Sequence, residues 1–123
     1  MNARSLLVVD DDLCACERLS GELSAIGFRP SFAHSWRGAV SALCSGHFDA
    51  VLLDESLAHR EGQFLIAGLR EHGHNQPVLI MSPMADQLLV DWVERGASDI
   101  ITKPTPPAQL KQRLASACAR PGH

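Results

Sequence analysis

The sequence contains no run of about 18 apolar residues, the length that a helix needs to span a bilayer. It also lacks a secretory signal pattern, because the N-terminal segment MNARSLLVVDDD reaches acidic residues after only four apolar ones. Basic residues are not in excess, since 11 Lys and Arg stand against 14 Asp and Glu and give a net charge of −3. We therefore expect a cytoplasmic domain that binds neither membranes nor nucleic acids, because nucleic-acid binding usually needs a basic face.

Cysteine and histidine do not form a metal-binding pattern. Cys14 and Cys16 lie two residues apart in a predicted helix and so point to different sides of it. Cys44 and Cys118 lie within apolar helical patterns, and the six histidines are scattered, with no second cluster at ligand spacing. We expect reduced, buried or half-buried thiols and solvent-exposed histidines, with no set of ligands that favours zinc.

Short apolar runs alternate along the chain with segments of helical periodicity, without repeats, low-complexity tracts or linkers. The predicted strands are residues 6–9, 28–33, 50–53, 78–81 and 100–102. Apolar residues three and four apart predict helices within residues 13–26, 36–44, 64–69, 88–93 and 110–118. Glycines at positions 27, 46, 73 and 96 follow helical stripes, where a left-handed cap favours glycine. Asp12, Ser35 and Thr105 are placed as N-caps, with Pro106 at a first helical position.

Five strand–helix units in 123 residues predict a parallel sheet with helices on both faces. Because crossovers between parallel strands are right-handed, few topologies remain, and the strand order 2-1-3-4-5 is common at this size. We therefore predict an α/β fold of the flavodoxin-like (βα)5 type, in one domain over residues 1–123. A site in such a fold lies at the carboxyl ends of the strands, near the switch point between strands 1 and 3.

Polar residues follow every central strand of the predicted sheet. These residues are Asp10 and Asp11, Asp54, Ser82 and Lys103. The second strand ends at His34, but it is an edge strand and lies away from the switch point. Three carboxylates and one lysine in one crevice call for a cation, because like charges this close cannot all stay ionised. Oxygen ligands favour Mg²⁺, which often accompanies a phosphate.

A carboxylate beside Mg²⁺, a hydroxyl and an ammonium group is typical of phosphoryl transfer. In this interpretation Asp54 attacks phosphorus and becomes an aspartyl phosphate. Asp11 coordinates the metal directly and Asp10 does so through water, while Lys103 and Ser82 hold phosphoryl oxygens.

These residues make the chain resemble the response-regulator receiver domains of two-component signalling. LLVVDDD resembles the opening strand and acidic pair of that family, and VLLDESLAHREG resembles its phosphoacceptor segment. VLIMSPMAD carries the switch hydroxyl, and GASDIITKP carries the lysine–proline pair. The four motifs occur in family order and at family spacing, and the similarity covers essentially the whole chain.

The resemblance implies a role for each matching residue. Asp54 is implied to accept a phosphoryl group from a sensor histidine kinase or a histidine phosphotransfer protein. Asp10, Asp11 and Asp54, with the backbone carbonyl of Ser56, are implied to bind Mg²⁺ as the cofactor. Such a domain is a signalling phosphoacceptor that assists its own phosphoryl transfer, and is not classed as an enzyme.

Further implied roles concern switching. Ser82 is the switch hydroxyl, Lys103 contacts the phosphoryl group, and the Lys103–Pro104 bond is commonly cis in the family. Phosphorylation shifts a two-state equilibrium that reshapes the face formed by the fourth helix, the fifth strand and the fifth helix. The partners implied at this face are a downstream protein, an output domain or a second copy of the chain.

Several positions depart from the family pattern, among them Glu61 before Gly62, where many receivers have Asp-Gly before the third helix. Ala58 replaces a proline that the family often has four residues after the acceptor. Pro83 lacks the backbone N–H that usually helps to hold the phosphoryl group. Ile100 occupies a position where many receivers carry a Tyr or Phe that rotates as the switch. Pro83 and Ile100 bear on phosphorylation and switching more than on the fold.

Two alternatives stay open at this point. The first is a degenerate receiver, which keeps the fold as a phosphorylation-independent interaction module; Pro83 and Ile100 favour it. The second is a haloacid-dehalogenase-like phosphatase, in which Asp10 and Asp12 form a D-x-D motif and Asp10 is the nucleophile. The chain is short for that fold, and the segment DESLAHREG would have no role in it.

Overall fold

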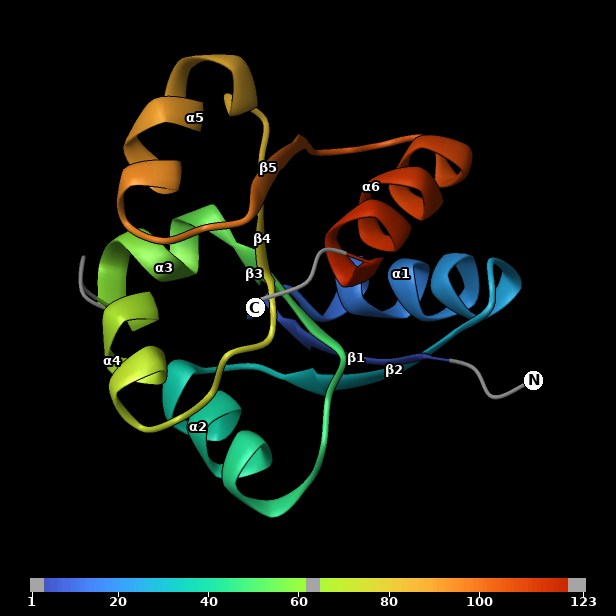
Figure 1. The fold of residues 1–123 in the computed structure, drawn as a ribbon. Helices are drawn as coiled ribbons and strands as arrows, with labels where there is room; N and C mark the ends of the chain where they lie inside the picture. The colour runs from blue at the N-terminus through green and yellow to red at the C-terminus, as the bar shows by residue number, and fades with distance from the viewer. Residues whose placement is uncertain (1–3, 62–64, 120–123) are drawn as a thin grey trace.

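A central sheet of five strands organises the computed structural model, which describes residues 4–61 and 65–119 (Figure 1). The strands are β1 (Arg4–Val9), β2 (Phe28–Ala33), β3 (Ala50–Asp54), β4 (Val78–Ser82) and β5 (Asp99–Thr102). Neighbouring strands pair in parallel in the order β2-β1-β3-β4-β5. The predicted fold class and strand order are confirmed.

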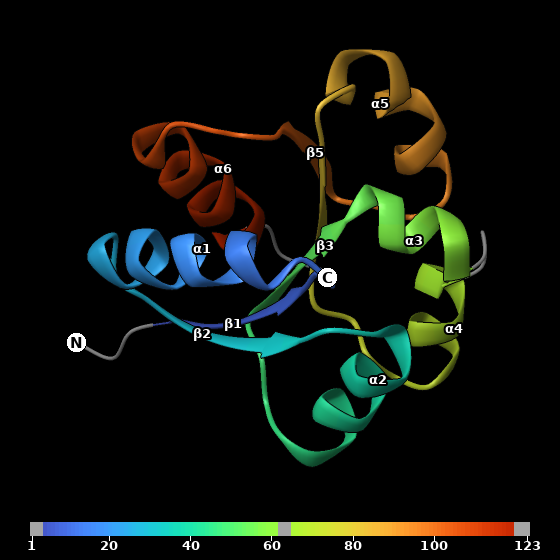
Figure 2. The ribbon, with the colours of Figure 1, turned by 180° about the vertical axis from the view of Figure 1, so that it is seen from behind.

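Helices cover both faces of the sheet. They are α1 (Leu13–Ala25), α2 (Trp36–Ser45), α3 (Glu55–Glu61), α4 (Leu65–Glu71), α5 (Ala85–Glu94) and α6 (Pro107–Ala119). α1 and α6 lie together on one face, and α2 to α5 cover the other (Figures 1 and 2). The fourth and fifth predicted helices are therefore α5 and α6. Among the described residues, no helix combines the length and the hydropathy that a membrane span requires.

The core has two halves, one on each side of the sheet. In β3, Val51 and Leu53 pack against the side of α2 to α5, whereas Leu52 packs against the side of α1 and α6. Because side chains alternate along a strand, a strand covered on both faces must be apolar at every position. This burial explains the unbroken run from Ala50 to Leu53, and it leaves Asp54 as the first polar side chain at the end of the strand.

One helix was not predicted from the sequence. The segment Glu55–Glu61 forms α3, although its apolar residues show no helical stripe. Leu57 and Ala58 anchor it because both are buried, and the N–H of Leu57 donates to Oδ2 of Asp54 at 3.2 Å. The helix predicted within residues 64–69 corresponds to α4, and Phe64 lies outside the described residues.

Several predicted details of the helix ends need correction. Gly27, Gly73 and Gly96 have positive φ, as predicted, but Gly46 has a φ of −147°, so it is extended and needs no glycine-specific conformation. Asp12 and Ser35 accept N-cap hydrogen bonds. Thr105 does not cap α6: its hydroxyl donates back to the carbonyl of Thr102, and α6 begins at Pro107 rather than Pro106.

The expectation that every thiol is at least half-buried was also wrong. Cys16 is buried and Cys118 is intermediate, but Cys14 and Cys44 are exposed. The buried face of α1 passes through Cys16 and the buried face of α2 through Leu43, so each exposed thiol lies just beside that face. A cysteine next to the apolar stripe of a helix is therefore not necessarily buried with that stripe.

Candidate functional site

The carboxyl ends of four strands bring polar side chains to one edge of the sheet. Asp10 follows β1, Asp54 ends β3, Ser82 ends β4 and Lys103 follows β5. Within the described part of the chain, the buried polar residues are Asp10, Asp54 and Ser82, which are 1%, 7% and 1% exposed. Burying a polar group is costly unless it is paired, so these three positions need partners in the fold.

Lys103 links the two buried carboxylates. Its Nζ lies 2.9 Å from Oδ2 of Asp10 and 2.8 Å from Oδ1 of Asp54. Burial by itself would lower the pKa of Lys103, but the hydrogen bonds and charges of Asp54 and Asp10 together raise it above its usual range. One ammonium group therefore partly neutralises the negative charge of two carboxylates at the ends of neighbouring strands.

Backbone groups orient both carboxylates. The second oxygen of Asp54, Oδ2, accepts the N–H of Leu57 at the start of α3. Oδ1 of Asp10 accepts the N–H of Asp12 at 3.0 Å. Each carboxylate thus has one oxygen on Lys103 and the other on a backbone donor, so both side chains are held before any ligand binds.

Asp11 completes an acidic cluster. One carboxylate oxygen from each of Asp10, Asp11 and Asp54 lies within 4.8 Å of the others, and Asp11 is the exposed member. Three carboxylate oxygens with no cysteine or histidine among them are the donor set that a hard divalent cation takes. The cluster fits Mg²⁺ in donor chemistry and in charge.

One residue at this cluster, Arg60, is not predicted from the sequence. Its Nη2 lies 2.5 Å from Oδ2 of Asp11, and its Nε donates to the backbone carbonyl of Ser56 at 3.3 Å. The hydrogen bond from Arg60 lowers the pKa of Asp11. The spacing of four residues between Ser56 and Arg60 indicates a contact only if the segment is a helix, and the sequence predicts no helix there.

A second missed contact involves His34. Its Nδ1–H donates to the backbone carbonyl of Asp10 at 3.0 Å, and the Cys16 thiol donates to the same oxygen at 3.6 Å. His34 follows an edge strand, yet β2 pairs directly with β1, so the side chain reaches the residue that follows β1. Burial raises the pKa of Cys16, which keeps the thiol protonated beside the acidic cluster.

Ser82 and Pro83 form a turn at the end of β4. Oγ of Ser82 accepts the N–H of Met84 at 3.0 Å, while the Ser82 carbonyl accepts the N–H of Lys103 at 3.0 Å. The Ser82 hydroxyl keeps its own proton to donate. Pro83 has no N–H, so the first backbone donor after Ser82 is that of Met84.

Ile100 and Pro104 lie at different depths. Ile100 is 4% exposed, pairs with Ile80 in the sheet and belongs to the core beneath α5.

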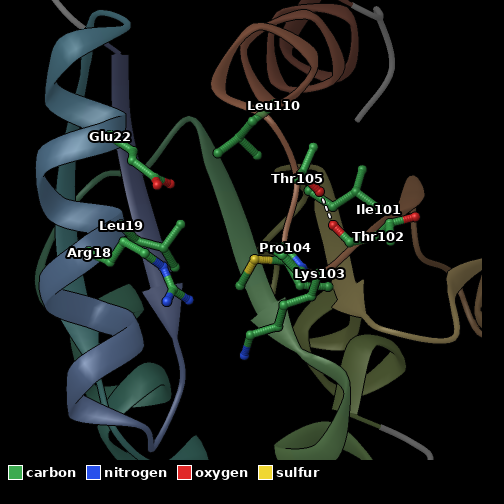
Figure 3. Close-up of a pocket in the computed structure, with 10 residues that line it drawn as sticks. Arg18, Leu19, Glu22, Ile101, Thr102, Lys103, Pro104, Thr105 and Leu110 are labelled. Carbon is green, nitrogen blue, oxygen red and sulfur yellow. Dashed lines mark hydrogen bonds between the residues drawn. The ribbon is translucent and has the colours of Figure 1, made fainter.

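The Lys103–Pro104 bond, for which the family resemblance implies a cis geometry, is cis. Pro104 borders a pocket of about 290 Å³ in which Arg18 and Glu22 of α1 face the segment after β5 (Figure 3).

Comparison with known proteins gives the family. Residues 6–115 match the response regulator receiver domain. The chain is 30% identical over 116 residues to the transcriptional regulatory protein QseB of Escherichia coli O157:H7, covering 94% of this chain and 53% of QseB. The chain thus spans about half the length of QseB.

Solved structures agree. A protein from Chloroflexus aurantiacus superposes with a TM-score of 0.86 at 28% identity, covering 97% of this chain and 100% of that one. The CheX–CheY–BeF3–Mg complex from Borrelia burgdorferi contains a chain with a TM-score of 0.83 at 25% identity, covering 97% of this chain and 92% of that one.

These matches argue against the haloacid-dehalogenase-like alternative. The structure also argues against it, because Asp12, the second residue of the D-x-D motif, is the N-cap of α1. The edge that carries Asp10, Asp54, Ser82 and Lys103 is the edge where the family motifs of the sequence come together. The chain belongs to the response regulator receiver domain family of two-component signalling.

Proposed function

We propose that this receiver domain accepts a phosphoryl group on Asp54 from a phosphohistidine of a sensor histidine kinase or a histidine phosphotransfer protein. A carboxylate oxygen of Asp54 forms the new P–O bond, the P–N bond to the donor imidazole breaks, and the imidazole leaves with the bonding pair and takes up a proton. The observation that carries this proposal is the contact of Lys103 with both Asp54 and Asp10 beside the acidic cluster.

The remaining site residues have distinct tasks in this proposal. Mg²⁺, held by Asp10, Asp11, Asp54 and the Ser56 carbonyl, would supply charge neutralisation for the carboxylates and phosphoryl oxygens. The relative from Borrelia burgdorferi, whose structure contains BeF3 and Mg²⁺, supports this assignment.

Phosphoryl oxygens would be held by two side chains. The Lys103 ammonium group carries a positive charge at the lip of the site, and the Ser82 hydroxyl has a proton to donate. Because Lys103 already contacts Asp54, it needs only a small movement to follow the charge as it passes to the phosphoryl group.

The output of the switch is proposed to be the face of α5, β5 and α6. On α5, Leu89, Val90 and Val93 are exposed apolar residues, with Val90 69% exposed. Exposed apolar residues on one helix are typical of a surface that contacts another protein. The partner would be a downstream protein, an output domain or a second copy of the chain, and the whole of residues 1–123 would act as one domain.

The test is intact mass after incubation with acetyl phosphate or phosphoramidate and Mg²⁺. We expect the wild type to gain the mass of one phosphoryl group and Asp54→Asn to gain none. Fluorescence of Trp92, which is buried in α5, would then report whether that helix responds. Labelling of the wild type and Asp54→Asn alike would mean that another residue is modified.

The degenerate receiver remains the second candidate, and Pro83 is the observation that favours it. A site without one preorganised donor stabilises the transferred group less well. No mass gain in the wild type, with Mg²⁺ binding demonstrated separately, would favour this candidate over the phosphoacceptor.

A further inference from the structure

Two cationic side chains divide the predicted metal ligands between them. Lys103 contacts Asp10 and Asp54, whereas Arg60 contacts Asp11 and the backbone carbonyl of Ser56. Each of the four groups assigned to Mg²⁺ therefore has a protein cation on one of its oxygens. The motifs of the family account for Lys103, but they give no role to Arg60.

Both of these contacts come from one guanidinium group. Its Nη2 is 2.5 Å from Oδ2 of Asp11, and its Nε is 3.3 Å from the oxygen of Ser56. The guanidinium group is planar and rigid, so it can hydrogen-bond to both oxygens at the same time. Asp11 and Ser56 belong to different segments, the loop after β1 and the start of α3, and a divalent cation would have to bridge these segments at the same oxygens.

The ion pair between Arg60 and Asp11 can open at low cost. The Arg60 and Asp11 side chains are 57% and 45% exposed, and ion pairs between solvent-exposed side chains contribute little to stability. The side chain extends from the penultimate position of α3, close to the end of that helix. A divalent cation could therefore displace the guanidinium without unfolding any element.

We propose that Arg60 is a tethered competitor of the divalent cation at this site. It holds Asp11 and the Ser56 carbonyl while the metal is absent and releases both when the metal binds, so the receiver binds Mg²⁺ more weakly than its carboxylates alone would. The inference rests on the metal site of the proposed function. It adds a residue that sets the Mg²⁺ concentration at which the site is loaded.

Metal binding measured by calorimetry, with MgCl₂ as the ligand, tests this competition directly. A unit positive charge about 5 Å from a divalent ion at an exposed site weakens binding by roughly threefold to tenfold. We expect Arg60→Gln to bind Mg²⁺ tighter by that factor and Arg60→Lys, which keeps the charge without the fork, to lie between the two. Equal or weaker binding by Arg60→Gln, or no binding by either protein, would overturn the proposal.

Arg113 provides the matched control. It forms an ion pair of 2.6 Å with Asp99 and its side chain is 51% exposed, so Arg113→Gln makes the same change of net charge at a comparable surface pair. We expect its Mg²⁺ affinity to equal that of the wild type. An increase in Mg²⁺ affinity as large as that of Arg60→Gln would mean that the effect comes from net charge, and it would overturn the proposed competition by Arg60.

Nitrogen-15 NMR of the arginine side chains supplies a second readout. The Nε–H signal missing in Arg60→Gln identifies Arg60, and we expect this signal to shift as MgCl₂ is added to the wild type. An unmoved signal at saturating Mg²⁺ would mean that the guanidinium stays in place.

The outcomes also separate this inference from the proposed function. If the wild type gains a phosphoryl group while Arg60→Gln binds Mg²⁺ no tighter, the competitor role fails and the phosphoacceptor role stands. If Arg60→Gln binds Mg²⁺ tighter while no protein gains a phosphoryl group, the reverse holds.

Discussion

Lys103 donates a hydrogen bond of 2.8 Å to Asp54, although 49 positions separate the two residues in the chain. The strands that present them, β5 and β3, are not neighbours, because β4 lies between them. The lysine side chain therefore reaches across the end of β4, close to where Ser82 ends that strand. This contact joins the end of β3 to the segment that follows β5, and it places the charge of Lys103 beside a buried carboxylate.

Replacing Lys103 with methionine should destabilise the fold, because Asp10 and Asp54 would lose their shared counter-ion. Removing one partner of a buried pair costs about 3–5 kcal/mol, and since the Lys103 side chain is partly exposed we expect about 1–3 kcal/mol. Urea unfolding measures this loss. Saturating Mg²⁺ should stabilise Lys103→Met more than the wild type, since the ion replaces the missing charge.

Lys111, an exposed residue of α6, provides the control for that experiment. Lys111→Met removes the same charge without uncovering a buried carboxylate, so it should change the free energy of unfolding by less than about 0.5 kcal/mol. Equal losses in the two variants would mean that the contact between Lys103 and Asp54 does not contribute to stability.

The stability should also depend on pH through Lys103. Its pKa is raised in the folded state, so its charge stabilises the fold fully below the unfolded pKa of about 10.4. This contribution is lost as the pH rises through the higher folded pKa. The difference in Tm between the wild type and Lys103→Met should thus be constant from neutral pH to about pH 10 and shrink above it. A difference that grows with pH in this range would contradict the assignment.

Pro83→Ala should accelerate phosphorylation, because alanine restores a backbone N–H directly after Ser82. One preorganised donor in a closed site contributes about 2–4 kcal/mol, and we expect a rate increase of roughly tenfold or more. The measurement is the rate of mass gain from acetyl phosphate at saturating Mg²⁺. An unchanged rate, in a variant as stable as the wild type, would show that position 83 supplies no donor to the reacting group.

Asp12 should affect stability but not phosphorylation. Its carboxylate accepts the N–H groups of Cys14 and Ala15 at 3.0 and 3.2 Å, so it caps α1. Asp12→Ala should cost about 1 kcal/mol, whereas Asp12→Ser, which keeps a capping oxygen, should cost only a few tenths. Thermal unfolding and intact mass measure both properties. If Asp12→Ser loses the mass gain while it stays folded, Asp12 is a site residue rather than a cap.

Much of the fold could be read from local patterns. Apolar runs such as that from Ala50 to Leu53 predict strands covered on both faces, and helical stripes between them predict the parallel sheet. The main failure was α3, since Leu57 and Ala58 are the only buried residues among the described side chains of that helix, and so short a contact leaves no period in the sequence. Its start depends on the Asp54 carboxylate, which accepts a hydrogen bond only once β3 is in place.

The sequence by itself determined which residues end the central strands, and because parallel strands end at one edge, it determined that Asp10, Asp54, Ser82 and Lys103 would meet. Only the tertiary structure decided which oxygen each cation contacts. Arg60 reaches Asp11 from α3, across to the loop after β1, and His34 reaches Asp10 because β2 pairs with β1. Such contacts depend on side-chain direction between segments far apart in the chain, and no local pattern of residues encodes that direction.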